Sequence, residues 1–240
     1  MTKLPRINRK ELRNPDEFIK KGSRFIRFLS ERRSPFLLVA SLAALTISLF
    51  YGYDYWNARK LTRAWKELVR VEKLEGPARW DELKKLHQAH AGLRPGSMAA
   101  VLVADHLFDS ARKEWYGDPE KARPVALEAA QWYGNARQFS ELLPTEKQLL
   151  GVDRGGALEL AGNHEEAMAE YKVASEIAGE AAAFALFRLA GIYEAQGDLP
   201  SAEQTYEKIS VSYPASEFAK MAKNAIRRIK SPNFKPKPIS

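Results

Sequence analysis

The chain has 240 residues, including 13 prolines and 14 glycines, which is enough for one sizeable folded domain or two small ones. It has no cysteine, which excludes disulfides, thiol catalysis, cysteine zinc sites and a lipidated-cysteine anchor. Of the net charge of +8, +7 lies in residues 1–34, which hold 11 Lys/Arg and 4 Asp/Glu, whereas residues 54–240 hold 27 Lys/Arg and 26 Asp/Glu. This near-neutral remainder argues against nucleic-acid binding, which needs a broad positive face.

Residues 1–34 form a basic leader. Apolar residues recur in it at helical spacing between lysines and arginines. That pattern fits a basic helix lying on anionic lipid, and it equally fits a disordered leader that only sets membrane topology. The apolar residues are Phe18, Ile19, Phe25, Ile26 and Leu29.

Residues 35–56 are predicted to be a transmembrane anchor. The 20 residues from Ser34 to Tyr53 carry no charge, and a helix rising about 1.5 Å per residue then spans a hydrocarbon core of about 30 Å. Pro35 suits a first helical turn, and the aromatic residues up to Trp56 suit a membrane interface. A buried helix of a soluble core seldom stays apolar on every face, and a cleaved signal peptide would need an unusually long basic region.

The charges that flank the anchor indicate its orientation. Six Lys/Arg lie between residues 20 and 33, against four between residues 59 and 66. The positive-inside rule therefore favours a cytoplasmic N-terminus, with the long C-terminal part translocated.

Residues 57–230 are predicted to be an all-α domain, because apolar residues fall at helical intervals and no segment alternates as a half-buried strand does. The strongest pattern lies late in the chain, where a set of small and aromatic residues recurs after 35 positions. A period near 34 is typical of the tetratricopeptide repeat. The predicted scaffold residues are Gly162, Ala167, Tyr171, Ala174, Leu186, Leu189, Ala190, Tyr193, Gly197, Ala202, Tyr206, Ile209 and Pro214.

Each residue type in this pattern has a mechanical reason. A small Ala202 lets the two helices of a hairpin approach closely, and Gly197 provides a turn without backbone strain. Tyr193 and Tyr206 fill the space between hairpins. The predicted fold class is therefore all-α, with one N-terminal transmembrane helix followed by a tetratricopeptide-like α-solenoid of helical hairpins.

The first of the two copies of the repeat is degenerate. Gly151 and Arg154 stand where the second copy has Leu186 and Leu189. We expect its first helix to be short or irregular, and the Arg154-Gly155-Gly156 segment to be a turn between repeats. A weaker third copy is suggested by residues at the same offsets upstream, with an insertion at residues 131–144. Those residues are Gly117, Ala122, Ala126 and Ala129.

A closing helix is predicted after Tyr213, and residues 231–240, with three prolines, are predicted to be a disordered tail. The closing helix carries apolar residues at helical spacing, all expected to pack inward. They are Phe218, Met221, Ala222, Ala225, Ile226 and Ile229.

The sequence predicts no catalytic, cofactor or metal site. His87 and His90 share a helical face without an acidic partner in a zinc-binding pattern, His106 is expected among core residues, and His164 at a helix start. The GVDRGG segment, residues 151–156, lacks the lysine of a phosphate loop, and no nucleophile elbow is present. We therefore expect a protein that is not an enzyme.

The layout of a basic leader, one anchor bordered by YDYWNARK, an Ala-rich helical region and late tetratricopeptide-like repeats resembles the YfgM-type ancillary subunits of the bacterial SecYEG translocon. This resemblance implies a bacterial inner-membrane protein with a cytoplasmic N-terminus and a periplasmic repeat domain. It also implies association with translocon subunits or periplasmic chaperones. The alternative function is a structural factor in cell-envelope assembly or division that acts through repeat-mediated oligomerisation.

Overall fold

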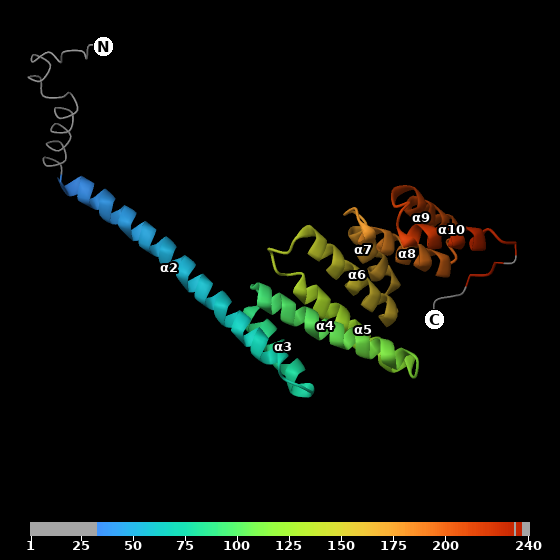
Figure 1. Ribbon diagram of the computed structural model, residues 1–240, viewed down its shortest axis with the longest axis horizontal. Coiled ribbons are helices and arrows are strands. Elements are labelled where there is room, and N and C mark those ends of the chain that lie inside the picture. The colour runs from blue at the N-terminus through green and yellow to red at the C-terminus, as the bar shows by residue number, and fades with distance from the viewer. Residues whose placement is uncertain (1–32, 233, 237–240) are drawn as a thin grey trace, which may run out of the picture. The chain divides into compact units, whose positions relative to one another are not determined.

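The computed structural model describes residues 33–232 and 234–236, so the predicted leader, apart from its last two residues, and positions 233 and 237–240 of the predicted tail lie outside the described residues. The described residues form nine helices and no strand (Figure 1). These helices are α2 (Arg33–Glu72), α3 (Pro77–His90), α4 (Arg94–Trp115), α5 (Pro119–Ala136), α6 (Pro144–Ala161), α7 (His164–Ala174), α8 (Glu180–Ala195), α9 (Leu199–Ser212) and α10 (Glu217–Ile229). The predicted all-α class is confirmed.

The chain divides into two compact units, residues 1–60 and 61–240, which we describe separately. In the first unit, α2 is long and apolar enough to cross a membrane, and its apolar window is unburied. The hydroxyls of this segment bond to the helix's own carbonyls, Ser41 to Leu38 at 2.9 Å and Thr46 to Ala43 at 2.8 Å. Such internal bonding suits a helix surrounded by lipid, where no water is available.

The second unit is a row of helices in which each packs mainly on its neighbours in the chain (Figure 1). The pairs α4–α5, α6–α7 and α8–α9 follow one another, and α10 packs on α8 and α9. Leu68 and Val71, from the end of α2, are buried against α3 and α4 at the start of the row. This sequential packing of helical pairs is that of an α-solenoid.

The turns of the last two pairs confirm the predicted role of glycine. Gly162 and Gly197, 35 residues apart, have φ angles of 89° and 82°, a left-handed conformation that glycine adopts without strain. Ala167 and Ala202 follow at the same offset, and both are fully buried. Close helix contact within each hairpin therefore rests on these alanines.

The degenerate copy differs from our expectation. Residues 151–156 lie in the middle of α6, a full helix of 18 residues, so the predicted turn and the predicted short helix are both wrong. A Cβ built on Gly155 would lie 2.7 Å from Cε1 of Tyr171, which shows that the ring occupies the place of a side chain. Tertiary packing thus overrides the low helix propensity of these glycines.

The α4–α5 pair corresponds to the predicted third copy. Asp118 caps α5 by accepting a hydrogen bond from the backbone N–H of Lys121, and three alanines of α5 are fully buried. Because α5 has 18 residues and α7 has 11, this copy is longer than the next. The extra residues of α5 lie partly within the predicted insertion, because the helix extends to Ala136. The buried alanines are Ala122, Ala126 and Ala129.

The closing helix α10 is present, with one correction to its inward face. Met221 is 45% exposed, whereas Ala219 is buried. The buried stripe runs through Ala222 and Ala225, and Met221 stands about 100° around the helix from Ala222. Residues 231–232 and 234–236 of the predicted tail contain neither helix nor strand.

Candidate functional site

A cavity of about 600 Å³ opens along the first helices of the three pairs, α4, α6 and α8. It combines aromatic and aliphatic walls with charged groups, which is the mixed lining typical of binding sites. The lining residues are Phe108, Arg112, Trp115, Val152, Asp153, Gly156, Glu159, Leu160, His164, Tyr171, Phe184, Arg188 and Ala195.

One end of this groove is apolar. Trp115, Leu160 and Ala195 lie in the last turns of α4, α6 and α8, and all three line the cavity. In the middle of the groove, a Cβ on Gly156 would lie 3.3 Å from Cζ of Phe108. The absence of a side chain at Gly156 therefore keeps the groove open. The sequence places small and aromatic residues so that three helix ends share one hollow.

Glu159 is the best-satisfied charge in the groove. Its carboxylate accepts a hydrogen bond from the Tyr171 hydroxyl at 3.0 Å and from Nε of Arg188 at 3.1 Å. The second oxygen of Glu159 lies 2.7 Å from Nη2 of Arg188. Burial, together with the Glu159 charge, raises the pKa of Tyr171, so its hydroxyl stays a proton donor. This trio closes the α6–α7–α8 side of the groove.

Asp153 is in a different environment. Burial is the main cause that raises the pKa of Asp153 to about 6, and the nearby Asp105 carboxylate is the second. Asp105 itself accepts a hydrogen bond from the Tyr133 hydroxyl at 2.7 Å. The described residues offer Asp153 no hydrogen-bond donor and no cation within pairing distance, so its charge is uncompensated.

The four histidines have structural settings in the described chain. Nδ1 of His87 lies 3.0 Å from the carbonyl oxygen of Gly96, and Nε2 of His90 lies 3.0 Å from Glu67. His106 stacks on Trp80 with ring centroids 3.7 Å apart. No group of three or more potential metal ligands occurs within the part of the chain that the structure describes.

His164 begins α7 as predicted, and it also lines the groove. Its Nδ1 is buried without a hydrogen-bond partner in the structure. Burial lowers the pKa of His164, and Arg123 acts in the same direction against the opposite effect of Glu159. The imidazole is therefore neutral at pH 7.

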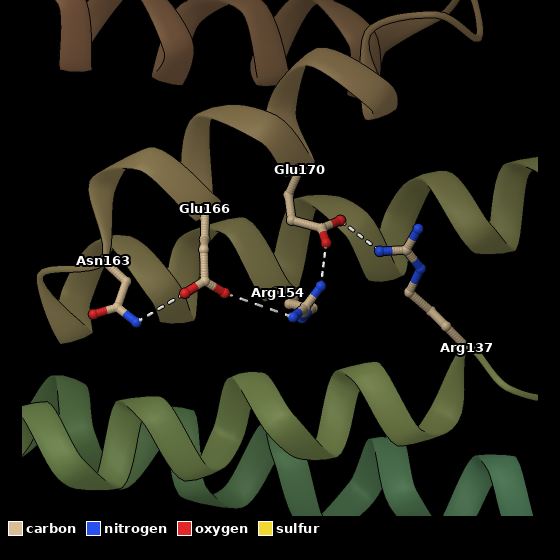
Figure 2. Close-up of polar contacts among 5 residues, drawn as sticks. All are labelled: Arg137, Arg154, Asn163, Glu166 and Glu170. Atoms are coloured by element: carbon tan, nitrogen blue, oxygen red, sulfur yellow. Dashed lines mark hydrogen bonds and ion pairs between the residues drawn. The ribbon is translucent and has the colours of Figure 1, made fainter.

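A second polar cluster joins α5, α6 and α7 (Figure 2). Glu170, only 9% exposed, is bound by Arg137 at 2.5 Å and by Arg154. Arg154 also lies 3.9 Å from Glu166, which accepts a hydrogen bond from the Asn163 side-chain amide at 3.3 Å. Figure 2 shows both oxygens of Glu170 directed at guanidinium groups, so this cluster is an ion-pair network within the fold, in which only Nε of Arg154 is buried without a hydrogen-bond partner.

The 13 residues of the predicted scaffold lie in the core, in turns or at the surface. Tyr193 is half-buried, Pro214 is exposed beyond α9, and Gly162 and Gly197 form turns. Only Tyr171 among the 13 also lines the groove. The nine predicted scaffold residues that remain, Tyr171 included, are buried. They are Ala167, Tyr171, Ala174, Leu186, Leu189, Ala190, Ala202, Tyr206 and Ile209.

Sequence reasoning missed the groove residues themselves. Phe108, Asp153 and Arg188 line one groove because α6 is a continuous helix, whereas the local sequence predicts a turn at residues 154–156. The sequence feature that indicates a continuous helix is the segment Leu158, Glu159 and Leu160, which follows the glycines without a break. A prediction of α6 as one continuous helix would have placed the first helices of the three pairs, α4, α6 and α8, side by side.

No match to this chain was found among known protein families, curated proteins or solved structures.

Proposed function

We propose that this chain is a membrane-anchored scaffold that binds a polypeptide segment of a partner protein in the groove along α4, α6 and α8. The observation that carries the proposal is the cavity of about 600 Å³ in which apolar walls and charged groups converge. First helices of stacked hairpins commonly present such a concave face to peptides. The groove offers Trp115 and Leu160 as apolar contacts and Asp153 as a polar one.

A second cavity, of about 730 Å³, is a weaker candidate. It lies against α7, α8 and α9, and most of its lining is polar. The two leucines that reach it, Leu186 and Leu189, are 2% and 5% exposed and belong to the core. Its other apolar lining residues are Val211, which is 80% exposed, and the half-buried Tyr193.

In this proposal α2 holds the body at a bacterial inner membrane. Exposed apolar side chains along residues 37–50 support an anchor, and the charge bias of its flanks favours a body on the periplasmic side. At the end of the anchor, Arg59 lies 4.4 Å from the Tyr55 ring centroid, a pairing suited to a membrane interface. The layout resemblance makes translocon subunits or periplasmic chaperones the proposed partners.

Site-specific photocrosslinking in cells tests this function. Leu160, in the groove, is replaced by p-benzoylphenylalanine, and the matched control carries the same replacement at Leu149, which is 54% exposed on α6 and lines neither cavity. We expect a light-dependent adduct with a discrete partner from position 160 and none from position 149. Equal adducts from both positions, or none from position 160, would contradict the groove function.

Mass spectrometry of the adduct then identifies the partner class. Peptides of translocon subunits or chaperones support the proposed association. Peptides of envelope-assembly proteins or of a second copy of this chain support the structural alternative instead.

A further inference from the structure

The charged groups of the groove differ in how well they are compensated. Glu159 has Arg188 and Tyr171 as partners, and Arg112 lies 3.8 Å from Asp109, with both side chains largely exposed. Asp153 has neither an ion pair nor a hydrogen bond among the described residues. An uncompensated carboxylate in a partly buried cavity is unfavourable in the free protein.

The surroundings of Asp153 are negative rather than positive. Burial is the main cause that raises the pKa of the Tyr133 hydroxyl. The carboxylates of Asp105 and Asp109, on α4, and of Asp153 raise this pKa further. The Arg112 guanidinium, which also lines the cavity, is 65% exposed and lies over the Phe108 ring at 5.8 Å. A positive group that enters this part of the groove therefore meets an unshared negative charge.

Resting on the proposed function, we infer that the groove selects a partner segment with a lysine or arginine side chain that pairs with Asp153, and an apolar side chain seated between Trp115 and Leu160. The Phe108 ring, an apolar wall of the cavity, suits the methylene stem of a basic residue. Charge complementarity thus identifies the ligand of this mixed cavity as a peptide segment with a basic residue.

The helix geometry fixes the spacing of the two anchors. Asp153 and Leu160 are seven residues apart on α6, which corresponds to about 10 Å along the helix axis. A peptide in the polyproline II conformation advances about 3.1 Å per residue with three residues per turn, so two residues three positions apart lie on the same face and cover about this distance. The expected pattern is a basic residue followed, or preceded, by an apolar residue three positions away.

Capped octapeptide libraries test this selectivity. Each library fixes Lys, Arg, norleucine or Glu at one position and Leu three positions away, in both orders, with the remaining positions random. The full chain, in phospholipid nanodiscs, is immobilised and the retained peptide is measured at pH 7.5. We expect the Lys and Arg libraries to be retained about tenfold more than the norleucine library, as a partly buried charge pair of about 1.4 kcal/mol gives.

Two variants locate the effect. In Asp153→Asn the ratio of Lys to norleucine retention should fall to near one, whereas Asp81→Asn, which removes an exposed carboxylate of α3, should leave it unchanged. For the unsubstituted chain the ratio should also fall between pH 7.5 and pH 5, because Asp153 gains a proton in that range.

Each outcome separates this inference from the proposed function. Equal retention of the Lys and norleucine libraries, or an unchanged ratio in Asp153→Asn, overturns the basic-residue selectivity and leaves the groove function standing. Retention of no library overturns both.

Discussion

The Tyr171 hydroxyl donates a hydrogen bond to Glu159 at 3.0 Å, and 35 residues later the Tyr206 hydroxyl donates to Glu194 at 3.2 Å. In both hairpins the tyrosine of the second helix bonds back to the first helix. Each glutamate is also bound by an arginine further along the chain, Arg188 on α8 or Arg228 on α10. The repeat therefore extends to polar contacts that tie each hairpin to the next.

The first prediction concerns this tyrosine. Tyr171→Phe keeps the buried ring and removes one hydrogen bond, so we expect a loss of about 0.5–1.5 kcal/mol in the free energy of unfolding. Tyr193→Phe is the control, because no hydrogen bond of the Tyr193 hydroxyl is seen among the described residues. Urea unfolding followed by circular dichroism compares the two. Equal losses would mean that the Tyr171 bond contributes nothing specific.

Two glycines in neighbouring first helices should respond in opposite directions to the same change. Gly155→Ala places a methyl group 2.7 Å from the Tyr171 ring, and this overpacking should cost about 1–3 kcal/mol. Gly191→Ala, in α8, meets nothing within 4 Å and should stabilise by about 0.5–1 kcal/mol through helix propensity. Thermal unfolding measures both. A stabilised Gly155→Ala variant would refute the packing of Tyr171 against α6.

The ion-pair network around Glu170 should behave as a coupled unit. The second repeat has Leu189 and Thr205 where this one has Arg154 and Glu170. Glu170→Thr alone leaves two poorly solvated guanidinium groups without their carboxylate, so we expect a loss of about 3 kcal/mol. Adding Arg154→Leu should recover part of that loss, giving a coupling energy of about 1–2 kcal/mol in a double-mutant cycle. Additive losses would show that the two side chains act independently.

Asp153 should lower stability in a pH-dependent way. Because its pKa is raised to about 6 in the folded chain, the folded state holds the proton more tightly than the unfolded state does. The free energy of unfolding therefore falls as pH rises from about 4 through 6. Asp153→Asn should be more stable than the parent chain at pH 7.5 by ~1 kcal/mol, since partial exposure screens the effect, and the gain should vanish near pH 4. Unfolding curves at the two pH values check this, and a loss of stability at pH 7.5 would contradict it.

The fold of the last repeat was predictable because its sequence is locally consistent. Gly197, Ala202 and Tyr206 each have the residue type that their backbone and packing require, so spacing alone located the turn and the buried contacts. The same agreement predicted α10, although the inward position expected for Met221 was wrong.

The degenerate repeat was not predictable in this way. Gly155 and Arg154 have local preferences that suggest a turn, and the reasons for a helix lie elsewhere in the chain, in the Tyr171 ring and the Glu170 carboxylate. The groove depended on this helix, so Asp153 could not be recognised as a groove residue from the sequence. Contacts between distant residues, rather than local propensity, decided both.

In the function that we propose, the groove is presented from a membrane, on the side opposite the leader. Because the chain has no cysteine, single cysteines at Ser23 in the leader and at the exposed Ser212 on α9 report the two sides. Intact spheroplasts are treated with a membrane-impermeant maleimide, and detergent-lysed spheroplasts serve as the control for reactivity. We expect the cysteine at position 212 to be labelled in intact spheroplasts and the one at position 23 to be labelled only after lysis. Labelling of position 23 with protection of position 212 would contradict it.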